Sequence, residues 1–332
     1  MKAAVIGSGA WGTALAIRLC KNGHDVTLWC RNPDKAREMT ATRMNPLLSG
    51  VVLPEELKMT GDYTCASGCE MVVIASPSFP LRSVCRNVAP YIDDDAIVVS
   101  VTKGLEEGTH LRMSQVVAQE TGRDVVVLTG PSHAEEVSMD VPTGLLSASV
   151  DQHKAEFVQD AFMSDTLRVY TSADPVGAEL GAALKNVIAL CAGITDGLGF
   201  GDNTKAMLMT RGLTEIARLG VALGAQKDTF AGLAGVGDLI VTCCSMHSRN
   251  RRAGILIGRG QSVQEAMKEV GAVVEGYYAA KSAYELGKAE GIDMPITEAA
   301  YKVLYEGAEV KDAVRNLLTR SRRTESEDAG WL

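Results

Sequence analysis

Short apolar runs alternate with longer amphipathic stretches over the first half of the chain. The amphipathic stretches predict helices over Gly12–Lys21, Pro33–Arg43, Phe79–Val88 and His110–Glu120. Several of the apolar runs lack polar positions, as expected of strands buried on both faces of a parallel sheet. This alternation predicts an α/β fold with a doubly wound sheet. The predicted strands are Ala3–Ile6, Asp25–Cys30, Met71–Ala75, Ala96–Val101, Val125–Leu128 and Gly144–Ser149, with Leu167–Tyr170 as a further candidate.

The pattern changes after Asp174-Pro175, and from Gly177 onward only helical periodicity is evident. Apolar residues recur there at spacings of three and four, which gives each segment one apolar face. We therefore predict two domains, an α/β domain over residues 1–175 and an all-α C-terminal domain over residues 176–332, whose polar end at 322–332 is expected to fray. The periodic segments are Leu180–Cys191, Lys205–Leu223, Ser262–Val270, Gly276–Leu286 and Thr297–Tyr305.

Length and charge agree with two globular domains and narrow the choice of ligands. The chain has 332 residues and a formal charge of −8, from 33 basic and 41 acidic residues. An acidic surface disfavours nucleic acid or an anionic membrane as the main partner, but a few local cations can still bind a small anion. No apolar run approaches a membrane span, and Met1-Lys2 leads directly into the first strand, so neither membrane insertion nor a secretory signal is expected.

The eight cysteines are scattered along the chain. The pair Cys65 and Cys69 and the adjacent Cys243 and Cys244 lack a second pair or histidines at zinc-like spacing. We therefore expect reduced thiols in a cytoplasmic protein and no metal site.

A glycine-rich loop joins the first strand to the first helix. Gly7, Gly9 and Gly12 fit the pattern G-x-G-x-x-G. The first glycine permits the tight turn, the second lets a pyrophosphate approach the backbone, and the third lets helix and strand pack closely. The helix N-terminus adds free N–H groups and a positive dipole end. Because position and spacing agree, we predict a Rossmann-like dinucleotide-binding domain.

The end of the second strand bears on which dinucleotide is bound. An NAD-selective fold usually has an acidic residue there, which binds the ribose 2′-hydroxyl. This chain has Arg31-Asn32 instead. Arg31 can pair with a 2′-phosphate, which favours NADP, and the alternative is a solvated loop arginine.

Two loops that follow predicted strands are candidates for ligand contact. In an open parallel sheet, ligands bind beyond the carboxyl ends of the strands. Lys103 lies in such a loop and can meet an anion or a carbonyl group. The loop Gly130-Pro131-Ser132-His133-Ala134 offers backbone N–H groups, and His133 is either a general acid or an ordinary loop histidine.

The helical half contributes a lysine and a polar cluster. Lys185 lies beside the apolar face of its helix, where burial lowers a lysine pKa from about 10.4 and suits it to proton transfer. The alternative is a lysine that reaches out to solvent. Asp238, in a glycine-rich turn, can orient an ammonium group. Ser248-Arg249-Asn250, at the start of a further helix, suits a phosphate group.

In their order along the chain, these motifs resemble the bacterial NAD(P)-dependent glycerol-3-phosphate dehydrogenases, and the resemblance covers almost the whole chain. Ser132 stands where the family often has Thr, and Val236 where Leu is common. The matching motifs are Ile6–Ala14, Thr102–Glu106, Gly130–Ser132, Leu184–Ala189, Thr195–Asn203, Ala234–Leu239, Ser248–Arg252 and Val273–Gly276.

The resemblance implies hydride transfer between NAD(P)H and dihydroxyacetone phosphate, in a cytoplasmic homodimer that supplies sn-glycerol 3-phosphate for phospholipid synthesis. It implies that Lys185 accepts and donates the proton, with Lys103 and Asp238 as its catalytic partners. The implied substrate contacts are Lys103, Gly130, Ser132, Lys185, Asp238, Ser248, Arg249 and Asn250. The implied dinucleotide contacts are Gly7, Gly9, Ala10, Trp11, Gly12, Arg31, Lys103, Ala134, Arg249, Val273 and Glu275.

Two other functions are compatible with the same two-domain pattern. A related β-hydroxyacid or sugar-acid dehydrogenase would carry a carboxylate-binding group in place of the Ser-Arg-Asn cluster. A dinucleotide-sensing protein without catalysis would not need a lysine on an apolar helix face.

Overall fold

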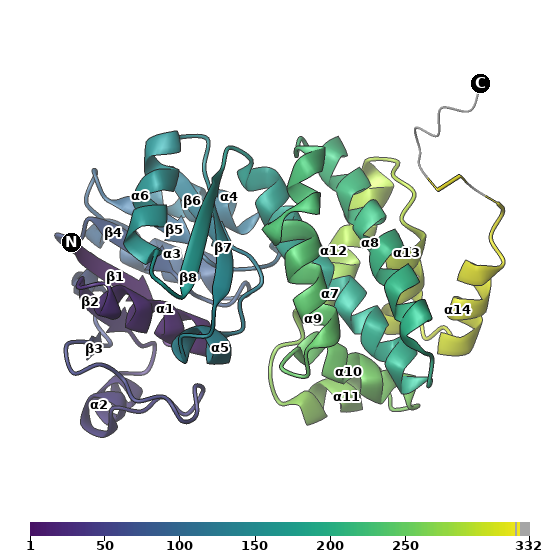
Figure 1. Ribbon diagram of the computed structural model, residues 1–332, viewed down its shortest axis with the longest axis horizontal. Coiled ribbons are helices and arrows are strands. Elements are labelled where there is room, and N and C mark those ends of the chain that lie inside the picture. The colour runs from purple at the N-terminus through teal and green to yellow at the C-terminus, as the bar shows by residue number, and fades with distance from the viewer. Residues whose placement is uncertain (323, 326–332) are drawn as a thin grey trace.

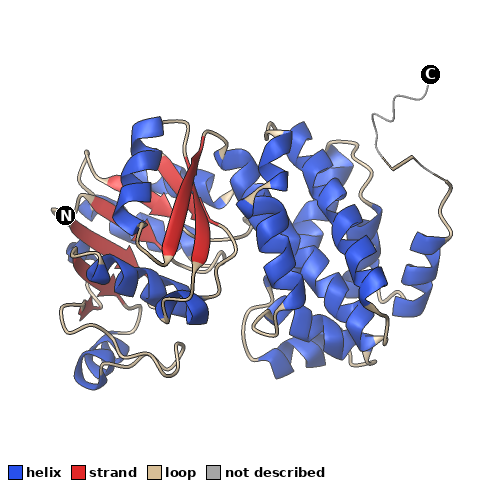
Figure 2. Ribbon diagram, viewed as in Figure 1, coloured by secondary structure: helices blue, strands red, loops and turns tan. Residues whose placement is uncertain are grey.

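The computed structural model describes residues 1–322 and 324–325, so most of the end predicted to fray lies outside the described residues. A sheet with helices on both faces is followed by a bundle of helices (Figures 1 and 2). The eight-stranded sheet has the order β3-β2-β1-β4-β5-β6-β7-β8. Its strands are β1 (Lys2–Ile6), β2 (Asp25–Trp29), β3 (Lys58–Thr60), β4 (Met71–Ile74), β5 (Ile97–Ser100), β6 (Val125–Thr129), β7 (Thr143–Ala148) and β8 (Leu167–Ser172).

The first six strands are parallel and follow the order typical of a doubly wound dinucleotide-binding fold, as the sequence predicts. Alternate residues of β1 show that the sheet is buried on both faces. Ala3 and Val5 pack into one apolar cluster, and Ala4 and Ile6 pack into another. The helices of this half are α1 (Ala10–Lys21), α2 (Pro33–Thr42), α3 (Leu81–Val88), α4 (Met113–Thr121), α5 (Ala134–Ser138) and α6 (Gln152–Phe162).

The structure differs from the predicted elements of this half in three ways. Strand β7 runs antiparallel to β6, and β3 and α6 are elements that the hydrophobic pattern did not reveal. The predicted helix over His110–Glu120 begins only at Met113, because a bridge between Leu105 and Arg112 closes the preceding residues into a turn. Likewise α3 begins at Leu81, after Pro80, and Phe79 is exposed.

Beyond β8, the described elements are helical. Helix α7 lies at the centre of the bundle and contacts α8, α9, α10 and α12 (Figure 1). Its length and mean hydropathy of 1.3 would suit a membrane span, but 94% of that apolar window is buried inside the protein. The helices are α7 (Pro175–Gly197), α8 (Asp202–Ala222), α9 (Asp238–Cys244), α10 (Arg249–Gly258), α11 (Val263–Val270), α12 (Glu275–Ala289), α13 (Pro295–Tyr305) and α14 (Val310–Leu318).

Glycines bring α7 and α10 into close contact. A Cβ atom at Gly193 would lie 2.1 Å from the backbone oxygen of Arg251, and one at Gly254 would lie 2.1 Å from that of Leu190. The backbones therefore approach at a distance that no side chain permits. This contact fixes the N-terminus of α10 beside the middle of α7.

We predict that Gly193→Ala destabilises the protein by about 1–3 kcal/mol, because the added methyl group forces two backbones apart. Chemical denaturation measures the change in the free energy of unfolding. The matched control is Gly201→Ala, since a Cβ there meets no atom within 4 Å. Equal stability of the two variants would contradict this account of the helix contact.

Candidate functional site

Two lysines and one aspartate from distant parts of the chain meet between the sheet and the bundle. Lys103 follows β5, Lys185 lies in the middle of α7, and Asp238 begins α9. The Nζ atom of Lys103 lies 2.8 Å from Asp238 Oδ2, and that of Lys185 lies 2.9 Å from Asp238 Oδ1. One carboxylate thus bridges two ammonium groups, each contributed by a different half of the molecule.

Lys185 and Asp238, the two residues contributed by the bundle, are almost fully buried. Lys185 is 4% exposed and Asp238 is 1% exposed. Lys185 also donates to Thr242 Oγ1 at 2.6 Å, and this hydroxyl donates to the backbone oxygen of Asp238 at 2.6 Å. Thr242 was missed by the sequence analysis, although its place one helical turn after Asp238 puts both residues on the same face of α9.

Burial controls the proton affinity of Lys185. Desolvation of the ammonium group, opposed by the charge of Asp238 and assisted by the nearby charge of Lys103, lowers the pKa of Lys185 to about 8. The buried lysine predicted from the apolar helix face is therefore confirmed. Because its pKa lies near neutrality, both the charged and the neutral amine are accessible under ordinary conditions.

The loop after β6 faces the same lysines. Lys103 Nζ donates to the backbone oxygen of Gly130 at 3.0 Å, and Ser132 Oγ donates to that oxygen at 3.0 Å. Gly130 has φ +136°, where a Cβ would lie 3.1 Å from the backbone oxygen of Gly144, so glycine is required. Ala134, also predicted as a contact, is buried at the start of α5.

His133 lies in this loop against His247 from the bundle, with ring centroids 5.5 Å apart. Its Nε2 atom is buried and has no hydrogen-bond partner among the described residues. Burial lowers the pKa of His133.

The Ser248-Arg249-Asn250 cluster lies at the N-terminus of α10. Ser248 Oγ accepts from Arg251 N at 3.2 Å and so caps the helix. Asn250 Nδ2 donates to Asn186 Oδ1 at 2.9 Å, and Asn250 Oδ1 accepts from Gly276 N at 2.8 Å. These bonds tie α10 to α7 beside Lys185 and to α12.

Two predicted residues of the cofactor set lie near the start of α12. Glu275 accepts from Ser78 Oγ at 3.1 Å, and this contact joins the bundle to the loop after β4. Burial raises the pKa of Glu275, and the charge of Arg249 opposes that shift. Arg249 itself is exposed, and so is Val273.

The glycine loop after β1 has the predicted geometry. At Gly7, with φ +135°, a Cβ would lie 2.4 Å from the backbone oxygen of Ala75, and a Cβ at Gly12 would lie 2.0 Å from that of Gly7. A Cβ at Gly9 meets no atom within 4 Å, so the backbone there faces open space. Helix α1 begins at Ala10 without a side-chain cap, which leaves its first N–H groups available to an anion.

These features fit the pyrophosphate of a dinucleotide. The indole Nε1 atom of Trp11 is buried and has no partner among the described residues. Arg31 follows β2 with its side chain exposed to solvent. Among residues 1–322 and 324–325, no group of three or more His, Cys, Asp or Glu side chains is arranged to hold a metal ion.

Both halves of the chain match known protein families. Residues 2–155 match the family model of the NAD-dependent glycerol-3-phosphate dehydrogenase N-terminus, and residues 174–315 match that of its C-terminus. The chain is 53% identical to glycerol-3-phosphate dehydrogenase (NAD(P)+) of Thermoanaerobacter sp. (strain X514) over 98% of this chain and 99% of that protein. It is 50% identical to the enzyme of that name from Clostridium perfringens (strain SM101), with the same coverage.

Solved structures agree with this match. The crystal structure of glycerol-3-phosphate dehydrogenase from Coxiella burnetii is 37% identical, with a TM-score of 0.91 over 96% of this chain and 99% of that chain. A ketopantoate reductase from Ralstonia eutropha is 19% identical, with a TM-score of 0.63 over 95% of this chain and 100% of that chain, and shares the fold alone. The predicted fold class is thereby confirmed.

We predict that Asp238→Asn lowers the pKa of Lys185 below its value of about 8, because Asp238 is the group that opposes desolvation. Heteronuclear NMR titration of the lysine side-chain amines measures this pKa. A Lys185→Met variant, which lacks the signal, assigns it. A pKa at or above 8 in Asp238→Asn would contradict the electrostatic account.

Proposed function

Because the chain belongs to the NAD-dependent glycerol-3-phosphate dehydrogenase family, we propose that it transfers a hydride reversibly between NAD(P)H and dihydroxyacetone phosphate. The product, sn-glycerol 3-phosphate, is a precursor of glycerophospholipids. The observation that carries this proposal is the bridge between Lys103, Asp238 and Lys185, because it joins the dinucleotide half to the bundle at one point.

Each half of the chain would bind a different ligand. Residues 1–175 form the dinucleotide-binding domain in this proposal, and residues 176–332 form the substrate-binding domain. The end of β8 at Ser172 and the start of α7 at Pro175 support a boundary near residue 175. We also assign the protein to the cytoplasm as a homodimer, in line with its family resemblance.

Lys185 acts as the general acid and base in this proposal. When the carbonyl is reduced, the protonated amine donates to the oxygen as negative charge develops. In the reverse direction, the neutral amine takes the hydroxyl proton. Its pKa of about 8 makes both states available, and such a group typically contributes about 10²–10⁴ in rate. Asp238 orients the amine, and Lys103 polarises the same oxygen.

The polar groups around this bridge suit a phosphorylated substrate. Ser248 uses its oxygen to accept from Arg251 N, so its hydroxyl proton remains available to an anion. Arg249 offers a bidentate fork and α10 the positive end of its dipole. The binding energy of the phosphate would then align the carbonyl with the nicotinamide. The proposed substrate contacts are Lys103, Gly130, Ser132, Lys185, Asp238, Ser248, Arg249 and Asn250.

The dinucleotide would lie along the carboxyl edge of the sheet. Its pyrophosphate fits the open backbone at Gly9 and the uncapped start of α1. Arg31 would face the ribose 2′ position, where it favours a 2′-phosphate. When bound, the reduced cofactor supplies the hydride. The proposed contacts are Gly7, Gly9, Ala10, Trp11, Gly12, Arg31, Lys103, Ala134, Arg249, Val273 and Glu275.

We predict that the purified protein oxidises NADH or NADPH only when dihydroxyacetone phosphate is present, and that Lys185→Ala lowers kcat at least about 10²-fold. Binding of NAD(P)H should be nearly unchanged, because Lys185 serves the substrate. The assay follows the absorbance of the reduced nicotinamide with each dinucleotide. Lys302→Ala, on the outer surface of α13, is the control. Full activity in Lys185→Ala would remove the acid–base role.

A second variant tests the phosphate contact. Arg249→Ala should raise the KM for dihydroxyacetone phosphate at least 10-fold, because a charge-assisted bidentate contact contributes about 1.5–3 kcal/mol. Steady-state kinetics measure it. Arg252→Ala, which removes an exposed arginine of the same helix, should leave KM nearly unchanged. Equal effects of the two substitutions would mean that the phosphate is bound elsewhere.

A further inference from the structure

The segment 101–112, which carries Lys103, passes from β5 into the bundle. Leu105 packs among the apolar residues of the bundle core with Leu180 and Leu184 of α7. Gly104 has φ +137°, and a Cβ there would lie 3.2 Å from the Ser78 side chain. The segment is therefore enclosed between the loop after β4 on one side and α7 on the other.

Polar side-chain contacts hold the same segment to the bundle at several further points. Arg112 Nη1 lies 2.5 Å from Glu179 Oε2 on α7, where the carboxylate is fully buried. His110 lies 3.3 Å from Glu285 and Glu107 lies 3.6 Å from Lys281, both on α12. Although the segment belongs in sequence to the sheet half, most of these contacts bind it to the helical half.

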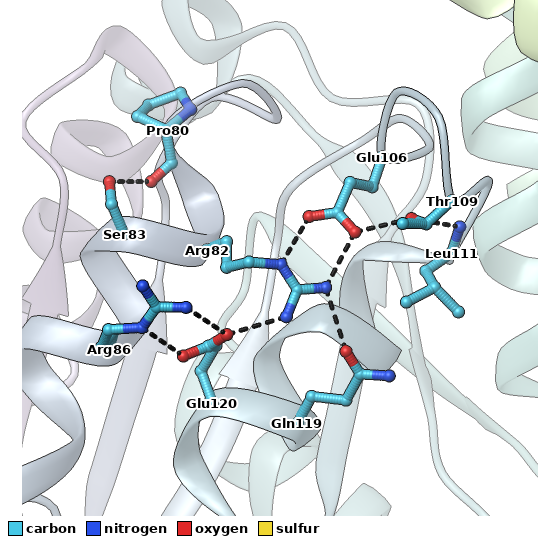
Figure 3. Close-up of polar contacts among 9 residues, drawn as sticks. All are labelled: Pro80, Arg82, Ser83, Arg86, Glu106, Thr109, Leu111, Gln119 and Glu120. Atoms are coloured by element: carbon cyan, nitrogen blue, oxygen red, sulfur yellow. Dashed lines mark hydrogen bonds and ion pairs between the residues drawn. The ribbon is translucent and has the colours of Figure 1, made fainter.

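One arginine links the segment back to the helices of the sheet half. Arg82 on α3 donates from Nε and Nη2 to the two carboxylate oxygens of Glu106, at 2.7 and 2.8 Å (Figure 3). Its Nη1 donates to Glu120 on α4 at 2.7 Å, and Nη2 also donates to Gln119 at 3.0 Å. Figure 3 shows the guanidinium group between these partners, with every nitrogen engaged.

Glu106 is also fixed within its own turn. Its backbone N donates to Leu111 O at 2.9 Å, and its backbone oxygen accepts from His110 N at 2.9 Å. Thr109 Oγ1 donates to its carboxylate at 2.6 Å. Only two residues separate Glu106 from Lys103, so the position of this turn determines where the lysine side chain starts.

We propose that Arg82 and Glu106 form a positioning pair that holds Lys103 against Asp238 at the junction of the two halves. This inference rests on the proposed function, in which Lys103 polarises the substrate carbonyl. Arg82 is 30% exposed and Glu106 is 19% exposed, and partly exposed ion pairs add little to stability. The bidentate geometry instead fixes position, and a misplacement of about 1 Å in a catalytic site can cost about 10²-fold in rate.

The same pair affects the proton affinity of Lys185 through Lys103. The titratable groups that interact electrostatically with Lys185 are Asp238 and Cys243 of α9, Lys103 and His133. Asp238 raises the pKa of Lys185, whereas Lys103 lowers it. When Lys103 is no longer held in place, its lowering effect weakens and the pKa of Lys185 rises.

Arg82→Met tests the proposal, with Arg86→Met as the matched control. Arg86 lies one turn further on α3 and bonds Glu120 at 2.9 Å, but it does not touch Glu106. Arg82→Met should lower kcat for dihydroxyacetone phosphate about 10-fold or more. In glycerol 3-phosphate oxidation, which needs neutral Lys185, the acid limb of its pH–rate profile should move to higher pH. Arg86→Met should change none of these.

A double variant separates positioning from general damage. If Arg82 acts through Lys103, Arg82→Met has no further effect on kcat in a Lys103→Ala background. Multiplicative losses in the double variant, or an unshifted pH profile in Arg82→Met, would overturn the inference.

Amide hydrogen exchange gives a test that does not depend on activity. Exchange across residues 102–112 should become faster in Arg82→Met and stay unchanged in Arg86→Met. Unchanged exchange in both variants would refute the positioning role by itself. Full activity in Lys103→Ala would instead refute the proposed role of Lys103. The exchange measurement would still decide whether Arg82 holds the segment 102–112 in place.

Discussion

The site depends on one buried carboxylate that faces two ammonium groups. Asp238 neutralises a single positive charge, so Lys103, Lys185 and Asp238 together carry a net charge of about +1 when both lysines are protonated. In a protein whose formal charge is −8, this local excess of positive charge is what can attract a small anion. Desolvation lowers the pKa of Lys185, Asp238 opposes that shift, and the charge of Lys103 adds to it. The charge of Lys103 therefore contributes both to the attraction of an anion and to the lowered pKa of Lys185.

Close helix packing makes this arrangement possible. A Cβ at Gly181 would lie 2.5 Å from Ala234 O, and one at Gly276 would lie 2.4 Å from Asn186 O. Glycines on each side of Lys185 thus allow the turn before α9 and the start of α12 to contact α7 at the backbone. This brings Asp238 to Lys185 and the start of α12 to Asn186, the next residue of α7. Larger residues at these positions would widen the junction and admit water, which would raise the pKa of Lys185 toward its value in solution.

Local sequence patterns predicted most of the fold because each relevant signal is local. Unbroken apolar runs identify buried strands, and the glycine loop identifies the start of α1. The pattern failed at β3, whose three residues are too short to show periodicity, and at the direction of β7, which depends on its neighbours in the sheet. It also failed for 110–112, where a tertiary turn outweighs helix propensity.

The site shows the same division between local and tertiary information. The apolar neighbours of Lys185 on α7 predict its burial, and the G-x-G-x-x-G spacing predicts the open backbone at Gly9. Two contacts cannot be predicted in this way: the hydrogen bond from Lys185 to Thr242 and the bidentate ion pair between Arg82 and Glu106. Each contact joins elements that only the tertiary fold brings together.

An anionic ligand would shift the equilibrium between the protonated and the neutral amine of Lys185. A phosphate bound near the N-terminus of α10, as proposed, would add negative charge on the side of Asn186 and Lys185, and negative charge favours the ammonium form. The pKa of Lys185 then rises from about 8, so the amine is more fully protonated when phosphorylated substrate is bound. Reduction of a carbonyl needs that protonated form, whereas oxidation of an alcohol needs the neutral one. In the proposed function, the phosphate of the substrate would therefore favour reduction at neutral pH, and oxidation would gain relative to reduction as the pH rises.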